Sequence, residues 1–201
     1  MTVQAQPSSC SSDGVAQPAA LLERFVNADC DSCWGSPQAP EAAAGSLAID
    51  WVVPGSRGDD APLSAVAVRD AQERLDSLRR KVPPDAATQF TARTASPYKL
   101  RIAHGLPIND YIGVAIEVSP PAQGATAWLL LVETLPKGTE GSAVERNLVR
   151  NTFVTTAPGR YEIRSMQIPE GAQPSRLRVV GWLEDSGGKI RAIAQSRCRK
   201  G

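Results

Sequence analysis

The chain has few of the features from which an activity is usually read. Histidine occurs once in 201 residues, at His104. A Ser-His-Asp or Cys-His mechanism could use only this residue, and nothing around it points to one. No phosphate loop or dinucleotide fingerprint occurs, so we expect no nucleotide cofactor. No methionine or histidine cluster accompanies the cysteines, and we expect no metal site.

The sequence also has neither a large excess of charge of one sign nor a long apolar run. The formal net charge is +1 and no long basic run occurs, which disfavours nucleic acid and anionic membranes as partners. No apolar stretch is long enough to span a bilayer. Hydrophobic residues make up 42% and charged residues 21% of the chain. This composition permits a packed core and argues against global disorder.

The first residues indicate export. Val3-Gln4-Ala5 followed by Gln6 resembles the small-residue end of a signal peptide, and a polar, Pro-containing segment follows. We therefore expect a leader over residues 1–19 and a periplasmic or secreted protein. The rival interpretation is a cytosolic protein with a disordered N-terminus.

The cysteines fit the exported interpretation. There are four, at Cys10, Cys30, Cys33 and Cys198, and an even number in an exported chain suggests two disulfides. Cys30 and Cys33 form the local pair, and Cys10 with Cys198 would tie the leader to the last strand. A bridge over so long a loop strongly restricts the unfolded chain in the chain-entropy model. Four cysteines allow three pairings, and the other two stay open.

The first third of the chain reads as alternating strands and helices. Residues 21–26 and 47–53 are apolar runs typical of buried strands. The Ala-rich residues 41–44 favour a short helix. Apolar residues then recur at helical spacing over 68–82, and the charged residues between them, Arg74 among them, read as a solvated face.

From about residue 90 onward the sequence becomes a series of short strands. Seven candidates are separated by Pro- and Gly-containing turns, over 98–103, 111–118, 128–133, 148–154, 161–168, 177–184 and 189–195. This spacing predicts a small antiparallel sandwich, with Trp128 and Trp182 in its core. Arg146 and Arg150 read as a solvated strand edge, or as partners for acids across the domain boundary.

Several stretches, in this order, resemble a family of exported bacterial thioredoxin-like proteins classed as a domain of unknown function. Leu22-Glu23-Arg24-Phe25 leading into Cys30-Asp31-Ser32-Cys33 is similar to its strand and CxxC motif. Residues 144–150, 180–185 and 193–195 are similar to patches of its β-rich second half. The resemblance implies an α+β fold: a shortened thioredoxin-like α/β domain over residues 20–92, and an antiparallel β-sandwich-like domain over 93–201.

The resemblance implies a substrate groove beside the cysteines, which thioredoxin-like enzymes shape with a cis-proline. Ser96-Pro97 is the nearest candidate, and Val82-Pro83 the next. We expect Pro97 and Trp34 to border this groove. Neither proline fits the pattern well, and the last thioredoxin helix is missing, which puts substrate binding in doubt.

The CxxC motif is the only place where the sequence proposes chemistry. At a helix start, backbone N–H groups would favour the Cys30 thiolate as nucleophile, with Cys33 resolving the mixed disulfide. Asp29 and Asp31 flank Cys30 and disfavour the thiolate. Two hypotheses stay open. One is a thiol–disulfide oxidoreductase acting on protein thiols; the other is a non-enzymatic binding or assembly module with a protein partner and structural disulfides.

Overall fold

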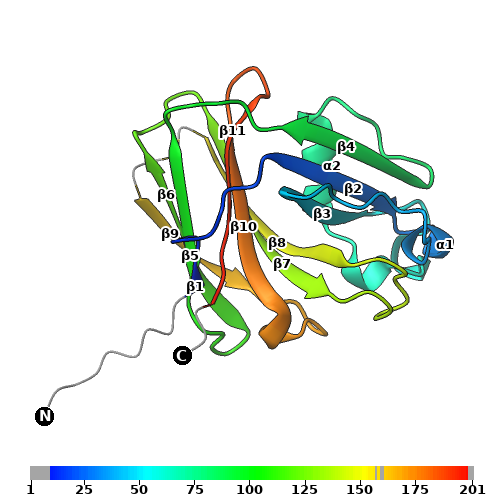
Figure 1. Cartoon of the computed structure of the whole chain (residues 1–201). Helices are drawn as coiled ribbons and strands as arrows, with labels where there is room; N and C mark the ends of the chain where they lie inside the picture. The colour runs from blue at the N-terminus through cyan, green and yellow to red at the C-terminus, as the bar shows by residue number, and fades with distance from the viewer. Residues whose placement is uncertain (1–9, 157, 159–160, 199–201) are drawn as a thin grey trace, which may run out of the picture.

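Two β-sheets packed face to face make up most of the molecule (Figure 1). The structure is a computed structural model and describes residues 10–156, 158 and 161–198. The larger sheet has the strand order β11-β10-β7-β8-β3-β2-β4. Its strands are β2 (Ala20–Asn27), β3 (Ser46–Val53), β4 (Ala86–Ala92), β7 (Thr126–Leu135), β8 (Arg146–Thr156), β10 (Leu177–Glu184) and β11 (Ile190–Gln195).

The smaller sheet has four strands in the order β1-β5-β6-β9. They are β1 (Cys10–Ser11), β5 (Lys99–His104), β6 (Tyr111–Ser119) and β9 (Tyr161–Gln167). Helices are short in the described residues: α1 (Asp31–Trp34), α2 (Arg69–Ser77) and the 3₁₀ turns η1 (Gly58–Asp60), η2 (Ser64–Val66) and η3 (Pro174–Arg176). None of the helices in this part of the chain is long and apolar enough to cross a membrane.

The larger sheet is mixed. β2 runs parallel to β3 along its whole length, and β3 meets β8 in parallel where Asp50 lies opposite Leu148. The other described strand pairs are antiparallel. Parallel neighbours need a crossover connection, and between β2 and β3 it contains the CxxC motif. Both strands are buried on both faces, which accounts for their near-continuous apolar sequence.

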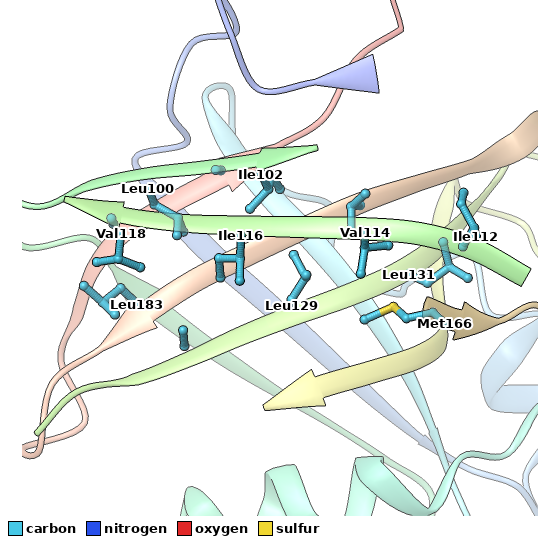
Figure 2. Packing of buried hydrophobic residues seen from close by; sticks show 14 of the residues in the cluster. Leu100, Ile102, Ile112, Val114, Ile116, Val118, Leu129, Leu131, Met166 and Leu183 are labelled. Carbon is cyan, nitrogen blue, oxygen red and sulfur yellow. The ribbon is translucent and has the colours of Figure 1, made fainter. Parts of the chain in front are cut away.

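The two sheets enclose the main hydrophobic core. Side chains of β5 and β6, among them Ile102 and Ile116, meet Leu129 of β7 and Leu183 of β10 (Figure 2). On the opposite face of the larger sheet, a second cluster packs around Trp51 and includes the α2 residues Ala71 and Leu75. The larger sheet therefore carries a buried cluster on each of its faces.

This second cluster holds a buried ionic group. Arg74 of α2 donates to both carboxylate oxygens of Glu23 and to Glu184, at 2.8 Å each. Its guanidinium carbon lies 4.9 Å and 5.0 Å from the ring centroids of Trp128 and Trp182. Arg74 is 1% exposed, so the prediction that it lies on a solvated face was wrong. The prediction that Trp128 and Trp182 are buried is confirmed, but they belong to this second cluster and not to the core between the two sheets.

The strand predictions held where the apolar pattern was regular. β2 and β3 match the predicted strands to within one residue at each end. All seven strands predicted in the second half exist, at slightly different limits. The sandwich arrangement of two sheets is confirmed. β4 and the two-residue β1 were missed, since neither shows an apolar run.

The predicted fold class was wrong. No thioredoxin-like α/β unit precedes the β-rich half: β2 and β3 lie in the same sheet as β8, β7, β10 and β11. The sheet therefore takes strands from both sides of the expected boundary at residues 92 and 93. The crossover from β2 to β3 holds only the single turn α1, too short to cover a sheet face as a thioredoxin helix does. The molecule is a mostly β two-sheet protein.

The helix predictions were only partly right. Residues 41–44 are not helical, although alanine favours helix. α2 covers Arg69–Ser77 and ends before the predicted residue 82. Arg79 adopts a positive φ of 56°, a left-handed conformation that stops an α-helix.

Candidate functional site

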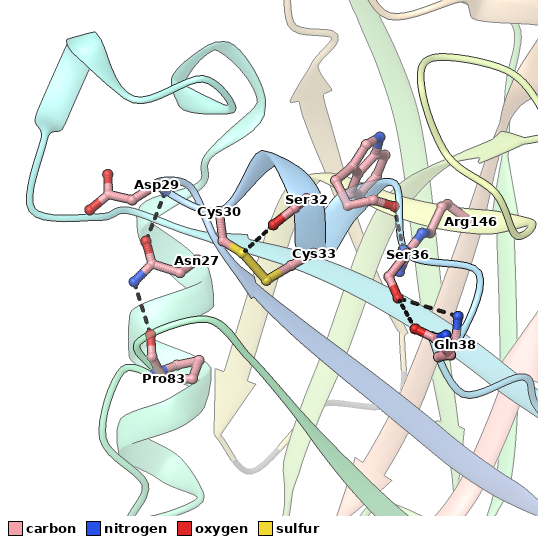
Figure 3. Close-up of a disulfide and its surroundings, with 10 residues drawn as sticks. Asn27, Asp29, Cys30, Ser32, Cys33, Ser36, Gln38, Pro83 and Arg146 are labelled. Atoms are coloured by element: carbon pink, nitrogen blue, oxygen red, sulfur yellow. Dashed lines mark hydrogen bonds between the residues drawn. A yellow bond between two sulfur atoms is a disulfide. The ribbon is translucent and has the colours of Figure 1, made fainter.

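The Cys30–Cys33 disulfide lies just beyond the C-terminal end of β2, at the start of the crossover to β3 (Figure 3). The two Cα atoms are 5.3 Å apart, and Cys33 belongs to the turn α1. Both cysteines are half-buried. The structure thus brings together the two residues predicted to be catalytic and joins them covalently.

A set of hydrogen bonds fixes the backbone before Cys30. The side-chain amide of Asn27 donates to Pro83 O at 2.9 Å, and its oxygen accepts from the Asp29 N–H at 2.9 Å (Figure 3). The Asp29 carboxylate accepts from the backbone N–H and the hydroxyl of Ser56, both at 2.8 Å. A Cβ on Gly55 would lie 2.3 Å from the Asp29 carboxylate. Gly55 is therefore required for this loop to close.

The carboxylates around the disulfide are placed differently. Asp29 turns away from Cys30 toward Ser56 (Figure 3). Desolvation is the largest single influence and raises the pKa of Asp29, but the hydrogen bonds from Ser56 and Arg57 and the charge of Arg57 together outweigh it, and the pKa lies below its ordinary value. Asp85, just before β4, has a carboxylate oxygen within 4.8 Å of both cysteine sulfurs. A carboxylate close to both sulfurs is thus supplied by a residue outside the motif.

The hydroxyl of Ser32 lies 3.6 Å from the sulfur of Cys30 (Figure 3). In the reduced protein a hydroxyl at this position can donate to a thiolate, which favours the charged form. Ser32, one of the two residues between the cysteines, therefore places a group next to Cys30 that stabilises its thiolate.

A cavity of about 270 Å³ opens beside Cys33. One wall is the start of β4, including Ala86, Ala87 and Thr88, and another is the segment from Ser36 to Pro40. β4 is the last strand of the larger sheet, and β2 is its only neighbour in that sheet. The cavity therefore adjoins a sheet edge with main-chain groups facing away from the sheet.

Arg24 and Arg146 also line this cavity and share one buried carboxylate. Arg24 makes a two-point contact with Asp50, at 2.8 Å and 2.7 Å, and Arg146 donates to the same group at 2.9 Å. Asp50 is 0% exposed and also accepts from the backbone N–H of Asn147 at 2.7 Å. Two guanidinium groups against one carboxylate leave one net positive charge in the cavity wall.

Trp34 packs against the same ionic group. It is 5% exposed, its indole N–H donates to Glu140 O at 2.8 Å, and the guanidinium carbon of Arg146 lies 4.8 Å from its ring centroid. Its carbonyl oxygen accepts from Arg146 at 2.8 Å. Trp34 does not line the cavity beside Cys33; it anchors α1 to the loop before β8.

Pro97 lies elsewhere. It is exposed in the connection between β4 and β5, and the hydroxyl of its neighbour Ser96 donates to Arg191 O of β11 at 2.7 Å. β11 is at the opposite edge of the larger sheet from β4. The cis peptide bond in the described residues is Ser119–Pro120, at the end of β6. Pro97 therefore does not border the CxxC disulfide. Pro83, the second candidate, lies closer, since its carbonyl oxygen accepts from Asn27 just before the motif (Figure 3), but its peptide bond is not cis.

The second disulfide joins Cys10 to Cys198, as predicted. Cys10 lies in β1 opposite His104 of β5, and both are buried, whereas Cys198 is exposed. The Nδ1 of His104 lies 3.0 Å from Gly105 O, to which it donates. Desolvation lowers the pKa of His104, and the bond to Gly105 offsets this only in part.

Sequence reasoning missed the charged residues of the site. Arg24, Asp50 and Arg146 sit in strands and are 4%, 0% and 1% exposed. The solvated-edge interpretation of Arg146 and Arg150 was wrong, since both are buried. The alternative, an acid across the expected boundary, holds for Arg146, which pairs with Asp50, whereas Arg150 pairs with Glu133 on its own side at 2.6 Å. The available signal was a charged residue inside each apolar run, since buried charges need partners.

Comparisons with known proteins add little to this picture. No family model and no curated protein matches the chain. One solved structure that matches is the crystal structure of an endonuclease/exonuclease/phosphatase from Beutenbergia cavernae DSM 12333, at 12% identity, covering 56% of this chain and 30% of that chain, with a TM-score of 0.31. A likeness this low carries no argument about fold or function. The resemblance to exported proteins of unknown function stays a prediction.

Proposed function

We propose that this protein carries out thiol–disulfide exchange with protein thiols through Cys30 and Cys33. The observation that carries the proposal is the position of the pair. The disulfide is half-buried, Cys33 lines a cavity, and that cavity adjoins the edge strand β4. A segment of a substrate protein can align with such an edge in extended conformation.

In the exchange, the Cys30 thiolate attacks a substrate disulfide and forms a mixed disulfide, and one substrate thiolate leaves. Cys33 then attacks the sulfur of Cys30, which closes the Cys30–Cys33 disulfide and releases the second substrate thiolate. Two electrons pass from the protein to the substrate, and the reverse sequence oxidises a substrate dithiol. The Ser32 hydroxyl, 3.6 Å from the Cys30 sulfur, stabilises the attacking thiolate.

The surroundings favour a moderate rather than a strong oxidant. The carboxylate of Asp85 lies within 4.8 Å of both sulfurs, and a nearby negative charge disfavours thiolates. The net positive charge of Arg24, Asp50 and Arg146 in the cavity wall opposes this effect. A strong oxidant requires a strongly stabilised reduced form, which these opposing charges do not provide.

Two disulfides in one chain support an oxidising compartment, and we propose that the protein is exported, periplasmic or secreted. The signal-peptide resemblance lies in residues 3–6, outside the described residues. A fusion of the native gene to a reporter that is active only outside the cytoplasm tests the location.

A redox titration in glutathione buffers tests the exchange. Free thiols are counted by alkylation and intact mass, and peptide mapping assigns them. We expect Cys30–Cys33 to open and close reversibly in the folded protein while Cys10–Cys198 stays closed. A Cys33→Ser variant should accumulate a mixed disulfide on Cys30, and a Cys30→Ser variant should not. If both pairs resist until the protein unfolds, the exchange proposal is wrong.

The second candidate function is a binding module in which both disulfides are structural. It is favoured by exposed apolar side chains on the smaller sheet: Tyr111, Tyr161 and Ile163 are 47%, 54% and 59% exposed. Tyr161 and Ile163 belong to β9, which is an edge strand. Two disulfides that resist reduction in the titration would support this function.

A further inference from the structure

Cys10, His104 and Cys198 form a row across three neighbouring chain segments. β1 pairs with β5 so that Cys10 lies opposite His104. On the other side of β1, Ser11 forms an antiparallel bridge with Arg197, which places Cys198 opposite Cys10. Residues directly opposite in antiparallel strands have Cβ atoms about 4.5–5.5 Å apart. Accordingly, the two sulfurs and a ring nitrogen of His104 lie within 4.8 Å of one another.

The imidazole of His104 has an unused ligand atom. The Gly105 carbonyl can only accept, so Nδ1 carries the proton in the 3.0 Å bond between them. Nε2 is then the nitrogen with a free lone pair. It is buried, has no hydrogen-bond partner among the described residues, and belongs to a side chain that is 6% exposed. Metal-bound histidines typically show this arrangement, with one nitrogen held by a carbonyl and the other on the metal.

From this geometry we infer that Cys10, Cys198 and His104 form a binding site for Zn²⁺ once the Cys10–Cys198 disulfide is reduced. Two thiolates and one neutral imidazole are a donor set that zinc prefers. Three protein ligands leave the fourth tetrahedral position open to water or an external ligand. The inference does not rest on the exchange proposed for Cys30 and Cys33.

The change of state needs an external two-electron reductant, for which a dithiol serves. The dithiol breaks the Cys10–Cys198 S–S bond, is itself oxidised to a disulfide, and leaves two protein thiols. Binding of Zn²⁺ then releases the two thiol protons. Cys198 is exposed, so the reductant can reach one sulfur without unfolding the sheet.

Cys10, His104 and Cys198 stay side by side after reduction, because backbone hydrogen bonds between their segments hold them in addition to the disulfide. The N–H of Ser11 donates to Arg197 O at 3.2 Å, and the N–H of Arg197 donates back to Ser11 O at 2.9 Å. On the other side, the N–H of Ser12 donates to Ile102 O at 2.9 Å. The ligands therefore remain near one another when the sulfurs separate.

The other cysteine pair gives an internal contrast. Cys30, Cys33 and Asp85 also place three donor atoms within 4.8 Å of one another. Asp85 is exposed, and water already solvates its carboxylate. No buried group without a partner faces that cluster in the described residues. The metal site is therefore assigned only to Cys10, His104 and Cys198.

A cobalt titration tests the site without interference from the CxxC pair. An untagged chain carrying Cys30→Ser and Cys33→Ser is reduced with a phosphine, separated from it, and titrated anaerobically with Co²⁺. We expect one Co²⁺ per chain, with thiolate-to-cobalt charge-transfer absorption and tetrahedral d–d bands, and displacement by Zn²⁺. The same protein with Cys10–Cys198 closed should show neither. Absence of these bands in the reduced protein, or equal binding by the oxidised protein, overturns the inference.

His104→Gln, added to this variant, separates a three-ligand site from two thiolates alone. Its folding is checked first in the oxidised form by circular dichroism. We expect Co²⁺ affinity to fall at least about 10-fold, since even outer-shell changes cost 10–100-fold; unchanged affinity would contradict the assigned ligand. If the variant does not fold, ¹⁵N NMR of the unaltered imidazole decides. His104 is the only histidine, and its Nε2 signal must shift on Zn²⁺ binding.

Discussion

Cys30–Cys33 closes a separation of 3 residues, whereas Cys10–Cys198 joins residues 188 apart. The first lies in a crossover loop, with Asp85 close to its sulfurs and a cavity beside it. The second lies in a strand ladder against a buried imidazole. The same covalent bond thus occurs in two settings. The number of residues between the two cysteines sets how much each disulfide stabilises the fold. The groups around each disulfide determine which reactions its cysteines can take part in.

The largest expected effect on stability comes from removing the carboxylate of Asp50, which pairs with Arg24 and Arg146 in the wall of the cavity beside Cys33. Asp50→Asn leaves Arg24 and Arg146 without their shared carboxylate, and breaking a buried ion pair costs about 3–5 kcal/mol. We expect a loss of this size in the free energy of unfolding, measured with urea. Asp13→Asn is the matched control: its partner Arg101 is in a half-exposed pair, worth about 0–1 kcal/mol. Equal losses in the two variants would contradict the buried network.

The next effect compares the disulfides directly. In the chain-entropy model, replacing Cys10 and Cys198 by serine costs about 5 kcal/mol and replacing Cys30 and Cys33 about 2 kcal/mol, a difference of about 3 kcal/mol, because the first pair closes the longer loop. Urea unfolding of the two double variants measures both values. A larger loss for the Cys30/Cys33 variant would show that the local disulfide holds the crossover together and is mainly structural.

The stability of the folded protein should depend on pH through His104, which lies opposite Cys10 of the second disulfide. The pKa of His104 in the folded protein lies below its ordinary value of 6.5 because the ring is desolvated. Between the two values the unfolded chain binds more protons, so stability falls as pH drops below about 6.5, by up to about 1.4 kcal/mol per pH unit. Above that pH the contribution is fully present. Thermal unfolding from pH 7.5 to 5.5 measures the slope, and His104→Gln should flatten it.

The smallest expected effect concerns Ser32. Its hydroxyl gives the Cys30 thiolate one hydrogen bond in an exposed setting, worth about 0.5–1 kcal/mol. With Cys10 and Cys198 kept closed, reduced Ser32→Ala should therefore be alkylated at Cys30 about threefold more slowly near neutral pH. Ser36→Ala, in the same loop, serves as the control. A rate unchanged by Ser32→Ala would mean that Ser32 does not assist exchange.

The strands were located well because a strand with one or both faces buried shows alternating or continuous apolar residues within a short stretch of sequence. Their arrangement in sheets depends on long-range contacts that no local pattern contains. β3 pairs with β8 through Asp50 and Leu148, and nothing near either residue shows this. β4 was missed because its exposed and half-buried residues, Ala86–Ala92, carry no apolar run. The motif Cys30-Asp31-Ser32-Cys33 favoured a thioredoxin-like fold, but a motif of four residues does not determine a sheet.

The candidate site, like the fold, was predicted only in its local features. The favoured pairing is the one observed: the spacing indicated Cys30–Cys33, and Cys10–Cys198 was the pair that remained. The sequence alone had left the other two pairings open. Arg146 was assigned mainly to solvent because a charge in an isolated strand has no visible partner, and its partner Asp50 is 96 residues away. Asp85 and His104 reach the cysteines only through strand pairing. An even number of cysteines indicates disulfides, whereas which cysteines pair and which groups surround them depend on the fold.

The order of strands in the larger sheet has a consequence for how the chain is made. β3 lies between β2 and β8, so it lacks one neighbour until about a hundred further residues have been synthesised. β1 gains its second neighbour only when Arg197 emerges. A chain interrupted before that residue would expose unpaired strand edges and an unbridged Cys10. Such species aggregate readily, and the fold is therefore complete only once Arg197, far from β1 in the sequence, has joined β1.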